Sequence, residues 1–251
     1  MSIFKNLFGK SKNRRKCFPH IDDVFHYPSD LDLVFYPLVT ININEVIPGR
    51  NKWIHFVDVW NNGDIEDDMF GEYRNRDFIK FKLENSKYHY FGNKTAFPNY
   101  SNLENWKKES MEEYAAHSNE YIKIPTREEY ENSERHRKEL DRENIAFDYY
   151  LYVDQQISYL VNQERYQQKG QLITHKSYPK GYSYKIHEPL KQIGGVPQWE
   201  QRDLTPFNKN GVSLTFIGHV KGYNYLENGS DNIYLFLDEA SNEVIQIFQY
   251  G

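Results

Sequence analysis

Three segments near the end of this chain decide its fold: Val212-Ser-Leu-Thr-Phe-Ile-Gly-His-Val220, Asn232-Ile-Tyr-Leu-Phe-Leu-Asp238 and Val244-Ile-Gln-Ile-Phe-Gln-Tyr250. Each is rich in β-branched and aromatic residues and has the length of a strand. The dipeptide Asn228-Gly229, a common hairpin turn, lies between the first two segments. The pattern predicts three antiparallel strands.

The first third of the chain carries a similar signal. Apolar and polar residues alternate from Val39 to Asn44, which predicts a half-buried strand. The aromatic and β-branched run from Trp53 to Trp60 predicts a second strand, and the residues from Asp77 to Leu83 predict a third. Both ends of the chain are therefore expected to be sheet.

The middle of the chain is predicted to be helical. Ser101 to Glu104 and Thr126 to Glu129 match the capping box that starts a helix. Further on, Ile157, Leu160 and Val161 form an apolar stripe, and Gly170 has the character of a helix C-cap. Strands, helices and strands in this order predict an α+β fold. We expect a mostly antiparallel β-sheet with a charged helical insertion at about residues 101–170, and the two sheet-rich ends are compatible with a diverged duplication.

Composition and charge set the domain organisation. The chain has 251 residues, of which 39% are hydrophobic and 27% charged, as is typical of a globular protein. Residues 1–17 contain six basic side chains and no acidic one, so we expect residues 1–20 to be a basic, disordered tail and residues 21–251 to be one domain. The remainder has 25 basic and 36 acidic side chains, which argues against nucleic acid as the main ligand.

The sequence predicts a protein of the bacterial cytoplasm. Cys17 is the single cysteine, so no intramolecular disulfide can form. The N-terminus lacks the apolar run and cleavage site of a secretory signal. No stretch approaches the roughly 20 apolar residues of a membrane-spanning helix, so we expect no integral membrane association.

Motifs of known catalytic chemistry are missing from the sequence. There is no glycine-rich phosphate loop, no complete Gly-x-Ser-x-Gly elbow and no His-x-x-x-His pair. Basic neighbours would favour a thiolate at Cys17, but the expected tail gives it no pocket. We therefore expect no enzyme, no cofactor and no zinc site.

An acidic segment follows the second predicted strand and contains Asp58, Asp64, Glu66, Asp67 and Asp68. It is not an EF-hand, because Trp60 and Met69 occupy positions that need ligands. Three interpretations remain open: a solvated loop, a looser calcium site, and an acidic patch that steers a basic partner.

A second candidate site is the segment from Gly194 to Gln201. Gly194 and Gly195 predict a tight turn, after which Pro197, Trp199 and Gln201 share one face of an extended stretch. One interpretation is a recognition corner in which the tryptophan stacks on a ligand. The other, which we favour, is a structural corner in which the tryptophan plugs the core.

Four motifs in the last 65 or so residues resemble the YwqG-like family of bacterial proteins. They are Ile193-Gly-Gly-x-Pro-x-Trp-x-Gln201, Phe216-Ile-Gly218, Ile233-Tyr-Leu-Phe236 and Gln246-Ile-Phe-Gln-Tyr250. The sequence departs from the family at His219, where a glutamine is typical. The resemblance implies a sheet-rich α+β fold and, because such genes often lie near polymorphic toxins, an immunity role.

The leading hypothesis is an immunity-type protein that occludes a protein toxin or effector, for which an exposed aromatic patch would provide anchors. An alternative is an intracellular module that binds a small ligand or peptide at Gly194 to Gln201, which requires a pocket beside Trp199. A third is a metal-dependent enzyme, which requires converging carboxylates with raised pKa values. The stoichiometry of binding stays open.

Overall fold

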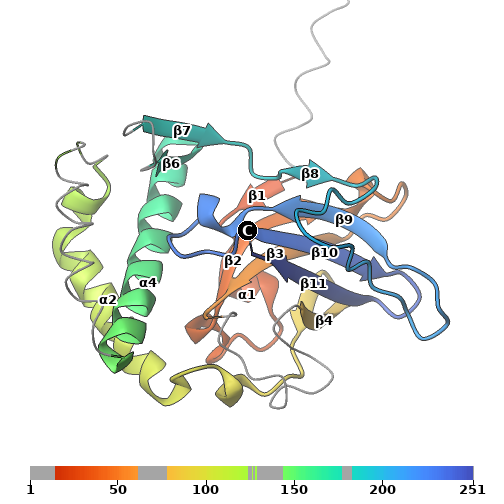
Figure 1. The fold of residues 1–251 in the computed structure, drawn as a ribbon, viewed down its shortest axis with the longest axis horizontal. Coiled ribbons are helices and arrows are strands. Elements are labelled where there is room, and N and C mark those ends of the chain that lie inside the picture. The colour runs from red at the N-terminus through yellow and green to blue at the C-terminus, as the bar shows by residue number, and fades with distance from the viewer. Residues whose placement is uncertain are drawn as a thin grey trace, which may run out of the picture.

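The computed structural model describes residues 15–61, 78–123, 126, 128, 144–176 and 183–250. Two antiparallel sheets form the body of the molecule, and two long helices lie side by side along one flank of it (Figure 1). The predicted α+β class, with most of the structure in antiparallel sheet and helices in the middle of the sequence, is confirmed.

The smaller sheet has the strand order β1-β2-β3 and comes entirely from the N-terminal part of the chain. Its strands are β1 (Arg15–Cys17), β2 (Phe35–Asn42) and β3 (Trp53–Val59). β1 pairs with β2, and Cys17 and Phe18 are buried in the core. The expected tail boundary at residue 20 is therefore wrong for residues 15–20. Apolar side chains at Cys17 and Phe18 draw this segment into the sheet despite its charged neighbours.

The larger sheet joins the two ends of the chain. Its order is β5 (Lys87–His89), β4 (Phe78–Glu84), β11 (Glu243–Gln249), β10 (Asn232–Asp238), β9 (Thr215–Val220) and β8 (Gln192–Ile193). All the predicted strands are present, and β4 pairs with β11 across more than 150 residues of sequence. The short strands β5 and β8 at the two edges were not predicted.

The free edge of β3 is closed by side chains of the larger sheet. The hydroxyl of Tyr88 on β5 accepts from the backbone amide of His55 at 2.9 Å and donates to its carbonyl. Ser86 accepts from the amide of Trp53 in the same way, at 3.0 Å. A core of aromatic and aliphatic residues fills the space between the sheets, and within it Phe81 stacks on Tyr88 at 4.7 Å. These contacts occupy backbone groups of Trp53 and His55 that an open strand edge would offer to another chain.

Both halves contain the same local unit, a strand followed by a 3-10 helix and a second strand. η2 (Ile43–Glu45) follows β2, and η6 (Gly222–Asn224) follows β9. In each unit the first carbonyl of the 3-10 helix accepts two amides, from Val46 and Ile47 in one and from Tyr225 and Leu226 in the other. A diverged duplication predicts this shared pattern of hydrogen bonds.

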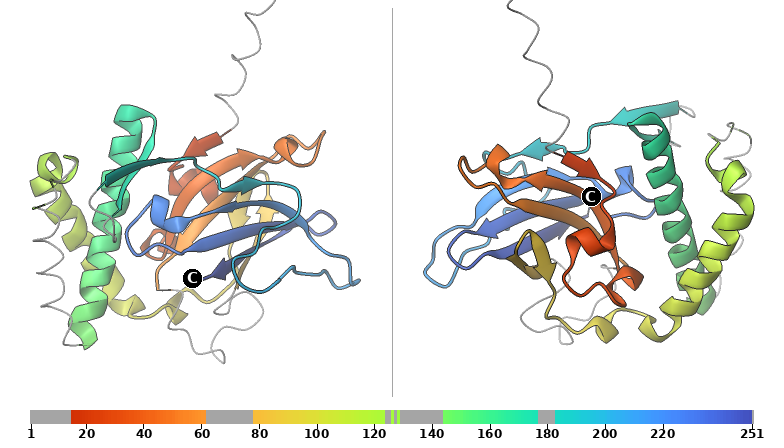
Figure 2. Two further views of the ribbon diagram at one scale, coloured as in Figure 1. Left: turned by 45° about the horizontal axis from the view of Figure 1, so that its top comes forward. Right: turned by 180° about the vertical axis from the view of Figure 1, so that it is seen from behind.

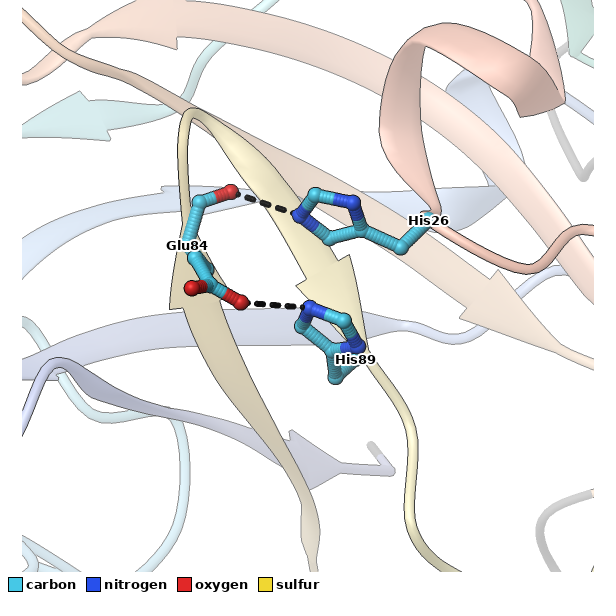
Figure 3. Close-up of side chains that lie close together, drawn as sticks. All are labelled: His26, Glu84 and His89. Atoms are coloured by element: carbon cyan, nitrogen blue, oxygen red, sulfur yellow. Dashed lines mark hydrogen bonds and ion pairs between the residues drawn. The ribbon is translucent and has the colours of Figure 1, made fainter.

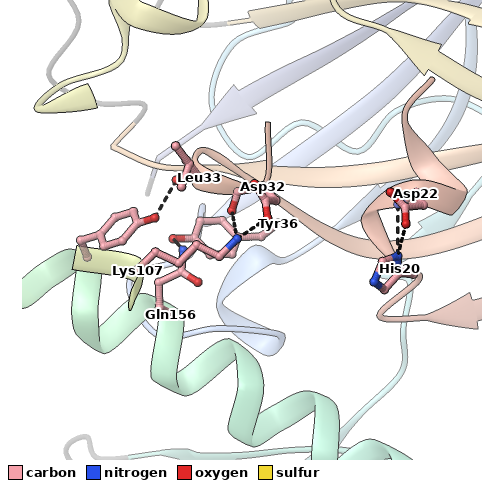
Figure 4. A network of polar contacts seen from close by, with 8 residues as sticks. His20, Asp22, Asp32, Leu33, Tyr36, Lys107 and Gln156 are labelled. Carbon is pink, nitrogen blue, oxygen red and sulfur yellow. Dashed lines mark hydrogen bonds and ion pairs between the residues drawn. The ribbon is translucent and has the colours of Figure 1, made fainter. Parts of the chain in front are cut away.

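The helices α2 (Tyr100–Tyr121) and α4 (Asn144–Lys169) pack against each other, and α4 also contacts β2. α4 holds the segment around β2 through three tyrosine or glutamine contacts, drawn in part in Figure 4: Tyr152 to the carbonyl of Leu33 at 2.9 Å, Gln156 to the hydroxyl of Tyr36 at 2.9 Å, and Tyr159 to the carbonyl of Pro37 at 2.7 Å. All eight residues of β2 are buried. The expectation of a half-buried strand is therefore wrong, because Thr40 and Asn42 on the face assigned to solvent are buried, where they hydrogen-bond His55 and Asn51 at 2.7 Å each.

The helix boundaries differ in detail from the expectation. α2 begins at Tyr100 after Asn99, which has a φ of 55°, so Ser101 lies inside the helix and does not cap it. The second capping box lies largely outside the described residues. Gly170 ends α4 with a φ of +67°, as predicted. In the predicted stripe Val161 is buried, whereas Ile157 and Leu160 are half-buried.

The remaining elements are short and connect the main ones. They are α1 (Ile21–Val24), η1 (Leu31–Leu33), η5 (Lys94–Ala96) and the hairpin of β6 (Leu172–Lys176) and β7 (Ser183–His187). Figure 2 shows this hairpin beside the C-terminal end of α4. No described helix combines the length and the hydropathy that crossing a lipid bilayer requires.

Candidate functional site

Asp58 is a core residue and not part of a partner-facing patch. It lies in β3 with 0% of its surface exposed. Its carboxylate accepts hydrogen bonds from the hydroxyl of Ser230 at 2.6 Å and from its amide at 2.8 Å, and from the amide of Val59 at 2.9 Å. Burial raises the pKa of this carboxyl, and the hydrogen bonds only partly offset the effect. The acidic residue thus ties β3 to the turn before β10, so the surface interpretation is wrong for this residue.

The other four acidic candidates, Asp64, Glu66, Asp67 and Asp68, lie outside the described residues. Their roles as a solvated loop, a calcium site or an acidic patch therefore stay predictions.

The corner from Gly194 to Gln201 is organised by the side chain of Gln192. Its amide nitrogen donates to the carbonyl of Gly194 at 3.0 Å and to that of Val196 at 2.7 Å, and its oxygen accepts from the amide of Gln198 at 3.1 Å. Gly194 and Gly195 have φ values of +57° and +78°, in the left-handed region that favours glycine. The predicted tight turn is therefore present, and the half-buried side chain of Gln192 holds it.

After this turn the chain covers the outer face of the larger sheet. Trp199 packs on Tyr234 and Phe236, with ring centroids 4.4 and 5.7 Å apart. Gln201 is bonded to the C-terminal end of the chain. Its backbone amide donates to the side-chain oxygen of Gln249 at 3.2 Å, and its side-chain nitrogen donates to the carbonyl of Tyr250. These contacts are those of a structural corner. Val196 in this segment points to solvent and is 82% exposed.

Two pockets of the described chain lie away from this corner. The larger, about 470 Å³, lies between η1 and α2, where Lys107 bonds Asp32 (Figure 4). The smaller, about 220 Å³, is lined by Trp60, Gln155 and Ser230 among others. Neither is beside Trp199, so neither supplies the pocket that the small-ligand alternative requires there.

Sequence reasoning missed a cluster of four aromatic rings, which we call the aromatic face: His26, Tyr27, His89 and Phe91. His89 lies at its centre. Its ring stacks on His26 at 4.0 Å and on Phe91 at 5.9 Å, and it contacts Tyr27 at 5.6 Å. Tyr27 is 76% exposed and Phe91 60% exposed, whereas the two histidines are half-buried. The face is thus a continuous aromatic surface.

Two segments far apart in the sequence build this face. His26 and Tyr27 follow α1, and His89 and Phe91 belong to β5 and the residues after it. The segments are joined by a parallel bridge between Phe25 and Tyr88 and by the amide of His26, which donates to the carbonyl of Tyr88 at 3.0 Å. Phe25 and Tyr88 are buried, so each of the two segments is anchored in the core.

Glu84 joins the two histidines of the aromatic face (Figure 3). Nε2 of His89 donates to the Glu84 carboxylate at 2.8 Å, and Nε2 of His26 donates to the Glu84 carbonyl at 2.9 Å. These three residues are the ones in the described chain that are placed to hold a metal ion. His26 and His89 are far apart in the sequence, so no metal-binding motif indicated that they meet. The hairpin dipeptide Asn85-Ser86 could have placed Glu84 and His89 on one face.

Comparisons of this chain with models of protein families, with curated proteins and with solved structures found no match. The likeness to the YwqG-like family therefore rests on the four sequence motifs and stays a prediction.

Proposed function

We propose that this chain is an immunity-type protein of the bacterial cytoplasm that binds a protein toxin or effector and neutralises it by occlusion. The observation that carries the binding part of the proposal is the aromatic face, with Tyr27 and Phe91 exposed around His89. The immunity part is motivated by the family resemblance. The proposal contains no catalytic step and no cofactor.

An exposed aromatic cluster suits the centre of a protein interface. Large aromatic rings bury much area and lose little conformational entropy on binding, and for this reason they are enriched among residues that dominate binding energy. Here the rings are preordered, because stacking between His26, His89 and Phe91 limits their rotation. Such a cluster could anchor an interface of about 1,000 Å² or more, the size that a specific complex needs.

Charge adds a second argument. The chain has a formal net charge of −5, and the part after residue 17 carries 25 basic and 36 acidic side chains. An acidic body attracts a basic partner and raises the rate of encounter. We therefore propose a basic toxin or effector as the partner.

The proposal is tested by capture and by neutralisation. The tagged protein is used to recover partners from a lysate of its own organism, and each recovered protein is expressed alone and together with this chain. We expect a protein that inhibits growth when expressed alone and does not when wild-type chain is present. A Tyr27→Ala, Phe91→Ala double variant should fail both to capture it and to restore growth.

The matched control is Phe207→Ala, which removes another exposed phenylalanine away from the aromatic face. It should capture and neutralise like the wild type. Recovery of no protein, or equal capture by the double variant and the wild type, would contradict the proposal. The first of these outcomes would favour the small-ligand module instead.

A further inference from the structure

We infer that His26, Glu84 and His89 form a binding site for a divalent transition-metal ion, with zinc the best match. The three side chains come from two segments that the fold brings together, and their ligand atoms all lie within 4.8 Å of one another. The inference rests on ligand geometry and does not depend on a protein partner.

The backbone that carries the three ligands is well ordered by hydrogen bonds. Glu84 ends β4 and His89 ends β5, and the turn between them, Asn85-Ser86, has φ values of 46° and 64°, as a two-residue hairpin requires. His89 lies opposite Lys82, so Glu84, two residues further on, shares its face. His26 is fixed to the same hairpin through the carbonyl of Tyr88. The ligands are thus attached to a framework that does not need to form on binding.

The side chains already converge. Both Nε2 atoms point at Glu84, one at its carboxylate and one at its carbonyl (Figure 3). Zinc takes histidine nitrogen and carboxylate oxygen at about 2.0–2.2 Å. Small rotations of the side chains therefore suffice to close the three atoms around an ion.

Metal binding requires one proton to leave each Nε2. Each Nε2 now carries the proton that it donates to an oxygen of Glu84. Metal binding takes the lone pair at Nε2, and the proton moves through solvent to Nδ1. Among the described residues neither Nδ1 atom has a hydrogen-bond partner that would oppose this exchange. The carboxylate of Glu84 becomes the third ligand.

The ligand set selects the class of metal. Two imidazoles and one carboxylate suit zinc and neighbouring transition metals, whereas calcium and magnesium prefer oxygen ligands alone. Three protein ligands leave a fourth position of a tetrahedral zinc ion open. Exposed Tyr27 lies beside both histidines, so water or a side chain of another molecule can reach the site to complete the shell.

The test is calorimetric titration of the full chain with Zn²⁺, after removal of any polyhistidine tag, which itself binds zinc. We expect one ion per chain. His26→Gln, Glu84→Gln and His89→Gln should each weaken the affinity about tenfold or more, because each removes one of three ligands. The matched control is His117→Gln, which removes a histidine from an exposed pair with Glu113 and should leave the affinity unchanged.

Two further measurements make the result decisive. Co²⁺ should replace Zn²⁺ and give the visible absorption of a tetrahedral site, and each variant should unfold at the wild-type temperature in chelator. No heat with the wild type, a zinc affinity equal to that of the wild type in all three ligand variants, or a tenfold loss in His117→Gln would each overturn the inference. Binding of Ca²⁺ as tight as that of Zn²⁺ would also overturn it.

Discussion

The side-chain amide of Gln246 hydrogen-bonds both backbone groups of Val57. Its nitrogen donates to the Val57 carbonyl at 2.8 Å, and its oxygen accepts from the Val57 amide at 2.9 Å. Gln246 is on β11 of the larger sheet and Val57 on β3 of the smaller sheet. The glutamine side chain therefore bonds the backbone groups that a neighbouring strand would otherwise pair with. Tyr88 does the same for His55, two residues earlier on β3.

Replacing Gln246 by leucine should destabilise the protein by about 2–4 kcal/mol. The substitution keeps the volume similar but leaves a buried amide and a buried carbonyl of Val57 without partners, and each such group costs about 1–3 kcal/mol. Urea unfolding would measure the loss. Gln168→Leu, on the exposed side of α4, is the control and should change the stability by less than about 0.5 kcal/mol. Equal stability of the two variants would show that the Val57 contacts contribute little.

Gly222→Ala should be strongly destabilising. A Cβ at this position would collide with the Asp58 carboxylate and with the backbone nitrogen and oxygen of Ser230, at 2.7 and 2.8 Å. Because backbone atoms cannot give way cheaply, we expect a loss of about 3 kcal/mol or more. Gly211→Ala is the control, since its Cβ would meet nothing within 4 Å and only the φ of +74° opposes it, at a cost of about 1 kcal/mol. Thermal unfolding of both variants checks the order, and a smaller loss at Gly222 than at Gly211 would refute this account.

Stability should fall as the pH drops from about 6.5 to 4. Burial lowers the pKa of His55 and of His219 to about 4, whereas the ordinary value is 6.5. In this window the unfolded chain binds protons that the folded chain does not, so each histidine stabilises the fold fully above pH 6.5 and loses this contribution on acidification, by up to about 3 kcal/mol. Neutral His55 is matched to its site, because Nε2 donates to the carbonyl of Ser86 and Nδ1 contacts the hydroxyl of Thr40 at 2.7 Å.

The measurement is the free energy of unfolding in urea at several pH values between 4 and 7. His219→Gln installs the residue that is typical of the YwqG-like family and should flatten the pH dependence by about the contribution of one histidine. An identical slope in His219→Gln and the wild type would exclude His219 as a source of acid sensitivity.

Trp199→Ala should cost about 2 kcal/mol of stability, whereas Val196→Ala in the same corner should cost less than about 0.5 kcal/mol. Trp199 stacks on Tyr234 and Phe236 and is half-buried, while Val196 is exposed to solvent. Chemical denaturation of both variants measures the difference. Unchanged stability in Trp199→Ala would argue that the tryptophan serves recognition and not packing.

Local patterns were sufficient for much of the fold. The strand over Asn232–Asp238 was predicted with its observed boundaries, because a short run rich in β-branched and aromatic residues bounded by polar residues leaves few other choices. The glycines at 194 and 195 predicted their turn for a similar reason, since their left-handed backbone is costly for other residues. Burial was harder to predict. The alternation in β2 indicated one solvent-exposed face, but Thr40 and Asn42 on that face are buried, and no local pattern records what packs over them.

The sequence by itself determined the α+β class, the order of strands and helices, and the corner from Gly194 to Gln201, because these depend on backbone preferences of neighbouring residues. Only the tertiary structure decided that Asp58 is buried against Ser230 and that His26 meets Glu84 and His89. Such contacts join residues more than 50 positions apart, and they are set by how the sheets and helices pack. Packing depends on the shape and burial of the whole chain, which spacing along a sequence does not record.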